Sequence, residues 1–181
     1  MSHAYRWSIP LLLAVLVTSC AEAPTAMPSG EAASLRKASA EPGSPREDWL
    51  KVLKQVTARY NATTQAIRAG YVPDTHCVES PLGGMGYHWG SPSRRDAEFN
   101  PLEPEVVLYA PTRGGLKLVA VEYVVLNVGQ PRPYFADYPF DIGGVMPLTL
   151  AGIPHWSLHV WLYQDNPNGI FAPFNPTVSC D

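Results

Sequence analysis

The sequence predicts an α+β fold in which one long N-terminal helix packs on an antiparallel sheet or on a partly closed small barrel. Two observations support this prediction: a helix-like segment opens the folded part of the chain, and several strand-like segments follow it. The 181-residue chain also contains 19 prolines, which favour long ordered loops over a helical bundle. We therefore expect a loop-rich domain built on one helix and one sheet.

The helix begins at Ser44-Pro45-Arg46-Glu47, where Ser44 can cap the first turn, Pro45 fits the first helical position and Glu47 can complete a capping box. A glycine, Gly70, is suited to end it. The spacing predicts a helix of about 25 residues with one apolar face. That face consists of Trp49, Val52, Leu53, Val56, Tyr60 and Ile67.

Strands are predicted in the second half of the chain. Residues 71–104 contain glycines and prolines that break any period, so we expect irregular structure there. Apolar, β-branched segments then predict strands, the first two forming a hairpin. These strands are residues 105–109, 116–127 and 156–163, with one short edge strand within 170–178. Residues 129–154 are rich in proline and glycine and predict a loop.

The first residues resemble a bacterial lipoprotein signal. A basic stretch ending at Arg6 precedes an apolar run at 9–17, which is about half the ~20 residues that span a bilayer. Val17-Thr18-Ser19-Cys20 resembles a lipobox, which implies a signal peptide at 1–19 and lipid on Cys20. Ordinary secretion, with Cys20 incidental, is the alternative.

The resemblance to lipoproteins also implies a location. Lipid on Cys20 would anchor the protein to a membrane of the cell envelope. Ala21, in place of an aspartate, favours the outer membrane if the cell is Gram-negative. Residues 20–44 carry almost no large apolar side chain and predict a disordered tether with a reach of about 25–30 Å. A single globular domain at 45–181 follows.

The net charge limits the classes of partner, and the cysteine content indicates the redox compartment. The net charge is −3 and no basic patch stands out, which argues against a nucleic-acid partner. If Cys20 takes lipid, Cys77 and Cys180 remain as an even pair in an oxidising compartment, which predicts a disulfide. Two free thiols with a redox or metal role are the alternative, although no CxxC spacing supports them.

Glu122 is the most informative single residue, because both faces of its predicted strand, residues 118–126, are apolar. A buried carboxylate is costly unless another group pairs with it. An ion pair with Arg or Lys, or an edge location near solvent, is one explanation. The other is a metal site in which histidines provide the remaining ligands.

Three histidines are candidates to join Glu122. On a strand, His155 and His159 share one face about 13 Å apart, too far to bind one metal, so we select His159 alone. His88, in the predicted turn at 86–90, can close the site. His88, Glu122 and His159 are therefore the candidate ligands of a divalent transition metal. His76 is a further candidate, although its position beside a disulfide cysteine explains it equally well.

Aromatic residues are frequent in the same region. Their rings can line a cleft for a glycan, peptide or hydrophobic ligand, or fill the core of a small sheet domain. The candidate ligand-binding residues are Tyr87, Trp89, Tyr123 and Trp161. The sequence contains no GxSxG, P-loop, HExxH or GxGxxG motif, so no catalytic residue is assigned and an enzyme is disfavoured.

Several motifs are specific enough to compare. They are Ala-x-x-x-Gly-Tyr at 66–71, Cys-Val at 77–78, Gly-Met-Gly-x-His at 84–88, Leu-Val-Ala-Val-Glu-Tyr at 118–123, Leu-His-Val-Trp-Leu at 158–162 and Asn-Pro-x-Gly-x-Phe-Ala-x-Phe-Asn-Pro-x-Val-x-Cys at 166–180. Through them, residues from about 55 to 180 resemble an uncharacterised family of secreted bacterial proteins. The resemblance implies that the three candidate ligands and the two late cysteines belong to shared motifs, and it supplies no activity.

The sequence thus predicts a membrane-anchored envelope lipoprotein that binds a divalent metal through a His/Glu cluster. The alternative is a non-catalytic envelope module that binds a glycan, peptide or hydrophobic ligand through an aromatic cleft. A metal-assisted envelope enzyme is a third hypothesis.

Overall fold

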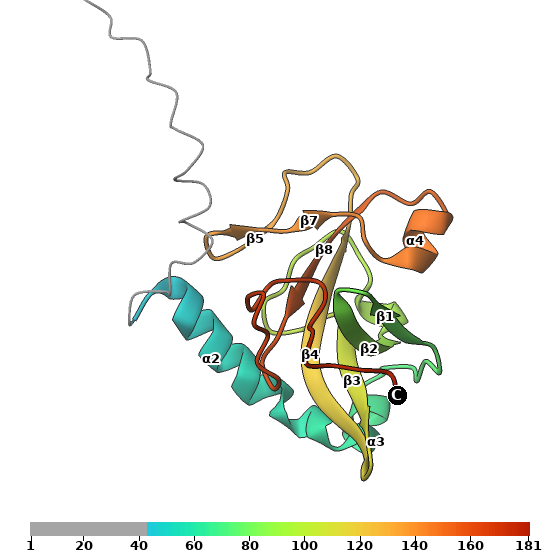
Figure 1. The fold of residues 1–181 in the computed structure, drawn as a ribbon. Helices are drawn as coiled ribbons and strands as arrows, with labels where there is room; N and C mark the ends of the chain where they lie inside the picture. Colours follow the sequence, from blue (N-terminus) through green and yellow to red (C-terminus); the bar gives the residue numbers. More distant parts are fainter. Residues whose placement is uncertain (1–42) are drawn as a thin grey trace, which may run out of the picture. The chain divides into compact units, whose positions relative to one another are not determined.

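The computed structural model describes residues 43–181, a mixed helical and sheet fold in which one helix lies against a curled antiparallel sheet (Figure 1). The predicted signal peptide, the lipidation site Cys20 and nearly all of the tether at 20–44 lie outside the described residues. Within 43–181, no helix has the length and apolar character needed to cross a bilayer.

Helix α2 (Pro45–Thr57) begins as predicted. Ser44 is extended, and its Oγ accepts a hydrogen bond of 3.3 Å from the backbone amide of Glu47. The Glu47 carboxylate in turn accepts a bond of 2.9 Å from the amide of Gly43, one residue before the cap. These bonds satisfy amides that have no partner within the helix.

The predicted single helix of about 25 residues is wrong. A 3₁₀ turn, η2 (Ala58–Asn61), follows α2, and Ala62 is extended before a short α3 (Thr63–Arg68). The Tyr109 hydroxyl donates a bond of 2.6 Å to the carbonyl of Tyr60, which a continuous helix would have used internally. The 13-residue α2 is the one helix of seven or more residues in the described part, and it is not N-terminal in the chain.

The helical segment 45–68, which comprises α2, η2 and α3, has a narrower buried face than predicted. Leu53 and Tyr60 are buried in the core between the helix and the sheet, and Trp49 packs against the same cluster. Val52 and Ile67 are 40% and 50% exposed, so these two do not belong to the buried face.

The sheet has six strands in the order β1-β2-β3-β4-β8-β7, all antiparallel to their neighbours, and it curls into a half-barrel. The strands are β1 (Cys77–Ser80), β2 (Gly83–Gly90), β3 (Val106–Thr112), β4 (Gly115–Leu126), β7 (Asp141–Ile142) and β8 (His155–Val160). The predicted hairpin corresponds to β3 and β4, and the strand predicted at 156–163 corresponds to β8.

Three regions differ from the prediction. Residues 71–104 hold β1, β2 and the short η3 (Pro92–Arg94) rather than only irregular structure. The predicted loop at 129–154 holds β7 and three further elements, which are β5 (Tyr134–Phe135), β6 (Tyr138–Pro139) and α4 (Met146–Leu150). The tail at 170–178 forms no strand; it makes one isolated bridge, between Asn175 and Gly84.

Two glycines explain why the sequence predicts no strand at β2. Glycine is normally unfavourable in a strand, so the segment carries a weak strand signal. Gly86 has φ +91°, and a Cβ there would overlap the carbonyl oxygen of Tyr109 on β3. A Cβ at Gly84 would lie 2.7 Å from the carbonyl oxygen of Val178. Both glycines are needed because another segment of backbone passes close to them.

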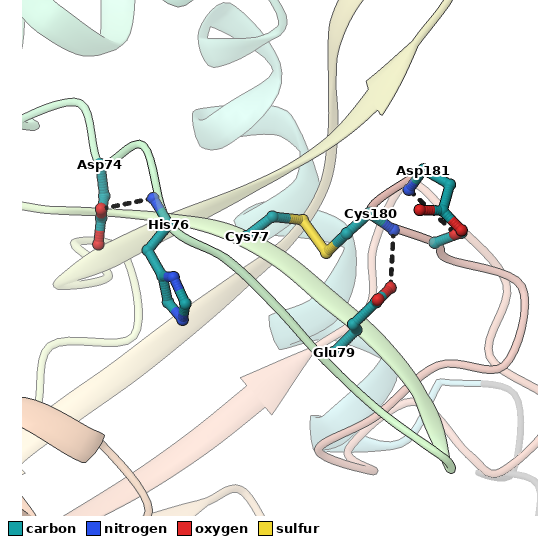
Figure 2. Close-up of a disulfide and its surroundings, with 7 residues drawn as sticks. Asp74, His76, Cys77, Glu79, Cys180 and Asp181 are labelled. Atoms are coloured by element: carbon teal, nitrogen blue, oxygen red, sulfur yellow. Dashed lines mark hydrogen bonds between the residues drawn. A yellow bond between two sulfur atoms is a disulfide. The ribbon is translucent and has the colours of Figure 1, made fainter.

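The disulfide between Cys77 and Cys180 confirms the predicted pairing (Figure 2). It joins the first residue of β1 to the penultimate residue of the chain, with the two Cα atoms 5.8 Å apart. The Glu79 carboxylate also accepts a bond of 3.0 Å from the Cys180 amide. The tail is therefore fixed to the sheet edge formed by β1.

We expect removal of this disulfide to lower the free energy of unfolding by about 2–5 kcal/mol, because a long loop of the unfolded chain is no longer closed. Urea unfolding of the paired variant Cys77→Ser/Cys180→Ser measures the loss. As a control, reductant should destabilise the wild type and leave the variant unchanged. Equal stability of the oxidised wild type and the variant would contradict the expectation.

Candidate metal site

The strand register places the three candidate ligands on one face of the sheet. Glu122 lies in β4, directly opposite His159 on β8, so the two side chains project from the same face. His88 on β2 pairs with Leu108, which pairs with Ala120 of β4. His88 therefore projects from that face too, two strands away and offset by two residues from Glu122. It lies within a strand and not in the predicted turn.

The three side chains meet at one point. The Nε2 atom of His88 is 3.8 Å from Oε2 of Glu122, and the Nε2 atom of His159 is 3.8 Å from Oε1. The two imidazole rings stand nearly perpendicular, with centroids 5.9 Å apart. One ligand atom from each residue lies within 4.8 Å of the others. The structure thus brings together the residues that the sequence analysis selected.

None of these contacts is a hydrogen bond. A separation of 3.8 Å is beyond hydrogen-bond distance. Among the described residues, Nδ1 of His88, Oε2 of Glu122 and Nε2 of His159 are buried without any hydrogen-bond partner. A buried polar atom without a partner costs about 1–3 kcal/mol, so the cluster is expensive unless a further group bonds to it.

Burial sets the protonation of the cluster. It lowers the pKa of His88 to about 4 and that of His159 to about 3, so both rings are neutral at neutral pH. It also raises the pKa of Glu122 to about 8, and the second cause is the nearby carboxylate of Glu105. Neutral imidazoles have a free lone pair, which is the form that binds a metal.

The donor set and its spacing fit a divalent transition metal. Two imidazoles and one carboxylate are a common set of protein ligands for such an ion. Atoms that share a tetrahedral ion at 2.0–2.2 Å lie about 3.3–3.6 Å apart. The 3.8 Å separations join His88 and His159 to different oxygens of Glu122, and one ligand atom from each residue lies within 4.8 Å of the others, so the side chains must move closer together to complete the geometry.

The site is closed on most sides. The Glu122 and His159 side chains are 2% and 7% exposed, whereas His88 is 21% exposed, so access is from the His88 side. The surrounding cluster on this face is apolar and includes Val106, Leu108, Ala120, Val124 and Trp161. An apolar shell strengthens the attraction between a cation and a carboxylate because few waters compete with it.

The four aromatic candidates do not share a surface. Trp89 and Tyr123 are buried in the cluster beneath α2, on the sheet face opposite the metal ligands, and Tyr87 packs against that cluster. Trp161 belongs to the other cluster, where its ring nitrogen donates a bond of 2.6 Å to the carbonyl of Ala172. These rings lie in or against the core on both sides of the sheet.

His155 makes its hydrogen bonds away from the candidate metal site, as its spacing from His159 predicts. Its Nε2 accepts a bond of 3.1 Å from the amide of Val145, and its Nδ1 lies 2.8 Å from the carbonyl of Ile153. It therefore holds the segment that leads into β8 and is not a ligand.

Glu105 is a buried carboxylate that the sequence analysis did not single out. Burial raises its pKa to about 8, and its Oε2 accepts a bond of 2.9 Å from the amide of Val124. It is 3% exposed and influences the pKa of Glu122. Its position directly before the apolar run Val106-Val107-Leu108 was the available signal, the same signal that identified Glu122.

Comparisons with protein-family models, curated proteins and solved structures found no match. The resemblance to a family of secreted bacterial proteins therefore stays a prediction.

The pH dependence of stability tests the environment of Glu105. Its pKa is about 8 in the folded protein, against an ordinary value of 4.5, so the folded state binds more protons than the unfolded chain between these values. Glu105 thus contributes stability that is complete below about pH 4.5 and lost as pH rises through about 8. We expect this contribution to lower the free energy of unfolding most clearly between about pH 6.5 and 8, because below 6.5 the lowered pKa values of His88 and His159 give a slope of the opposite sign.

Glu105→Gln should reduce that fall, because the amide oxygen still accepts the Val124 bond and no longer titrates. Chemical unfolding at several pH values measures the slope. Glu98→Gln, which removes a carboxylate from an exposed position, is the control and should leave the slope unchanged. Glu122 adds a slope of the same sign, and His88 and His159 add slopes of the opposite sign below about pH 6.5, so the comparison is between variants. Identical slopes for wild type and Glu105→Gln would contradict the prediction.

Proposed function

We propose that this protein binds a divalent transition metal ion through His88, Glu122 and His159, and does so while anchored to a membrane of the cell envelope by lipid on Cys20. The observation that supports metal binding is the convergence of three ligand atoms within 4.8 Å of one another, where, among the described residues, Oε2 of Glu122 and Nε2 of His159 are buried without a hydrogen-bond partner. The anchor is supported by the sequence of residues 6–20.

Metal binding would satisfy the groups that the fold leaves without partners. A cation at the centre of the cluster accepts the lone pairs of both imidazoles and stabilises the charged form of Glu122. Protonation of Glu122 alone removes its charge but gives no hydrogen bond to either ring at 3.8 Å. The geometry is therefore better matched to an ion than to a hydrogen-bonded trio.

The donor atoms limit the kinds of metal ion that the site can bind. Nitrogen and carboxylate donors suit Zn²⁺ and the neighbouring first-row ions, whereas Ca²⁺ and Mg²⁺ prefer oxygen ligands alone. We therefore take Zn²⁺ as the reference ion for the experiments.

We expect the full-length protein, purified in detergent, to bind one Zn²⁺ per chain, and Glu122→Gln to bind it at least about 100-fold more weakly because an anionic ligand is lost. Glu98→Gln is the control, since it removes a carboxylate from an exposed position and should bind Zn²⁺ like the wild type. Elemental analysis and calorimetric titration provide the measurements. A wild type that neither retains nor rebinds Zn²⁺ would refute the proposal.

The anchor is tested separately. Cys20→Ser should abolish incorporation of labelled palmitate and move the protein out of the membrane fraction, because the sulfur that accepts lipid is gone. Ser29→Ala, in the same tract, is the control and should remain in the membrane fraction. Continued labelling and membrane retention of Cys20→Ser would show that Cys20 is not the anchor.

A further inference from the structure

The chain between α3 and β1 passes beside His88. Val72 pairs with Gly90, and Cys77 pairs with Tyr87, both in antiparallel sense. Residues 73–76 therefore lie opposite only two residues of β2, His88 and Trp89, so the segment must bulge from the sheet edge. All four residues of this bulge are exposed.

The bulge carries a second group of metal-binding residue types, Asp74 and His76. The Oδ1 atom of Asp74 accepts a bond of 2.9 Å from the His76 amide, which fixes the turn between them. Within the described residues, the His76 ring itself makes no hydrogen bond, so it is free to rotate. After burial and the backbone bond with Gly86, the charge of Asp74 raises the pKa of His88 and that of His76 lowers it.

The disulfide restrains the position of His76. Its neighbour Cys77 is bonded to Cys180, and in Figure 2 the His76 ring projects away from that bond. On the other side of the bulge, the amide of Val72 donates a bond of 2.9 Å to the carbonyl of Gly90. The bulge is therefore held at both ends, next to the most exposed of the three ligands, His88.

We propose that His76 is the fourth protein ligand of the metal ion bound by His88, Glu122 and His159. The inference rests on the proposed function, since it requires an ion at that cluster. The three buried ligands approach the ion from within the sheet and leave the His88 side uncovered. His76 lies on that side, and rotation of its free side chain brings a ring nitrogen toward the open position.

A fourth protein ligand has a functional consequence. Zinc sites with four protein ligands are structural or storage sites, whereas catalytic sites keep one position for water or substrate. With His76 bound, the ion has no position left for a reacting molecule. The site then serves to hold metal or to stabilise the sheet edge rather than to catalyse a reaction.

The number of bound imidazoles tests this directly. The full-length protein is loaded with Cu²⁺, whose pulsed EPR spectrum reports coordinated imidazole nitrogens, and Zn²⁺ affinity is measured in parallel. We expect three imidazoles in the wild type and two in His76→Ala, with Zn²⁺ bound at least about tenfold more weakly by the variant. Thr75→Ala, in the same bulge, should match the wild type.

The outcomes separate this inference from the proposed function. If wild type and His76→Ala both show two imidazoles and equal Zn²⁺ affinity, the three-ligand site stands and His76 is not a ligand. If the wild type binds neither Cu²⁺ nor Zn²⁺, the metal site and its fourth ligand are both refuted. A change from three imidazoles to two establishes His76 as a ligand.

Discussion

The carboxyl group of Glu122 lies in the middle of β4, a strand whose neighbours β3 and β8 cover both of its edges, and whose two faces are both packed. A charge at such a position costs several kcal/mol unless a partner compensates for it. Among the described residues, the basic side chains within 4 Å of this carboxyl are two imidazoles, at 3.8 Å. The chemistry of the domain therefore depends on which group compensates the charge of that carboxyl.

The strand register is what brings the three ligands to one face of the sheet. Neighbouring strands lie about 4.8 Å apart, so the side chains of His88 and Glu122 reach toward each other across β3 and come within 3.8 Å. Gly86 permits the close approach of β2 to the backbone of β3. The tail then covers β2 at Gly84, and the disulfide fixes that tail to β1.

The two faces of the sheet have different roles. The face beneath α2 holds most of the large aromatic side chains, including Tyr109 and Tyr123. The opposite face has smaller apolar residues, such as Ala120 and Val124, which leave room for polar ligands. Because side chains alternate along a strand, Tyr87 and Trp89 of β2 lie on the face opposite His88, and Tyr123 of β4 lies on the face opposite Glu122.

Much of this arrangement could be predicted from local sequence. The cap at Ser44, the hairpin of β3 and β4 and the alternation along β8 depend on residues close together in the chain. The pairing of Cys77 with Cys180 followed from counting cysteines, and the choice of Glu122 followed from a single charge within an apolar run. Strand periodicity selected His159 over His155, whereas His88 was selected by residue type alone, because the sequence predicts a turn at its position.

The tertiary structure decided what depends on contacts between distant segments. The helix is interrupted at Ala62, close to the carbonyl of Tyr60, to which the Tyr109 hydroxyl of β3 donates a hydrogen bond. By propensity, the glycines of β2 predict irregular structure. They lie in a strand because the backbones of β3 and of the C-terminal tail pass through the space that side chains would occupy. The burial of Glu105, and the bulge at 73–76 that carries His76 opposite His88 and Trp89, likewise depend on contacts between distant segments. Local propensity determines which elements can form, and only packing determines which backbone groups and ligands meet.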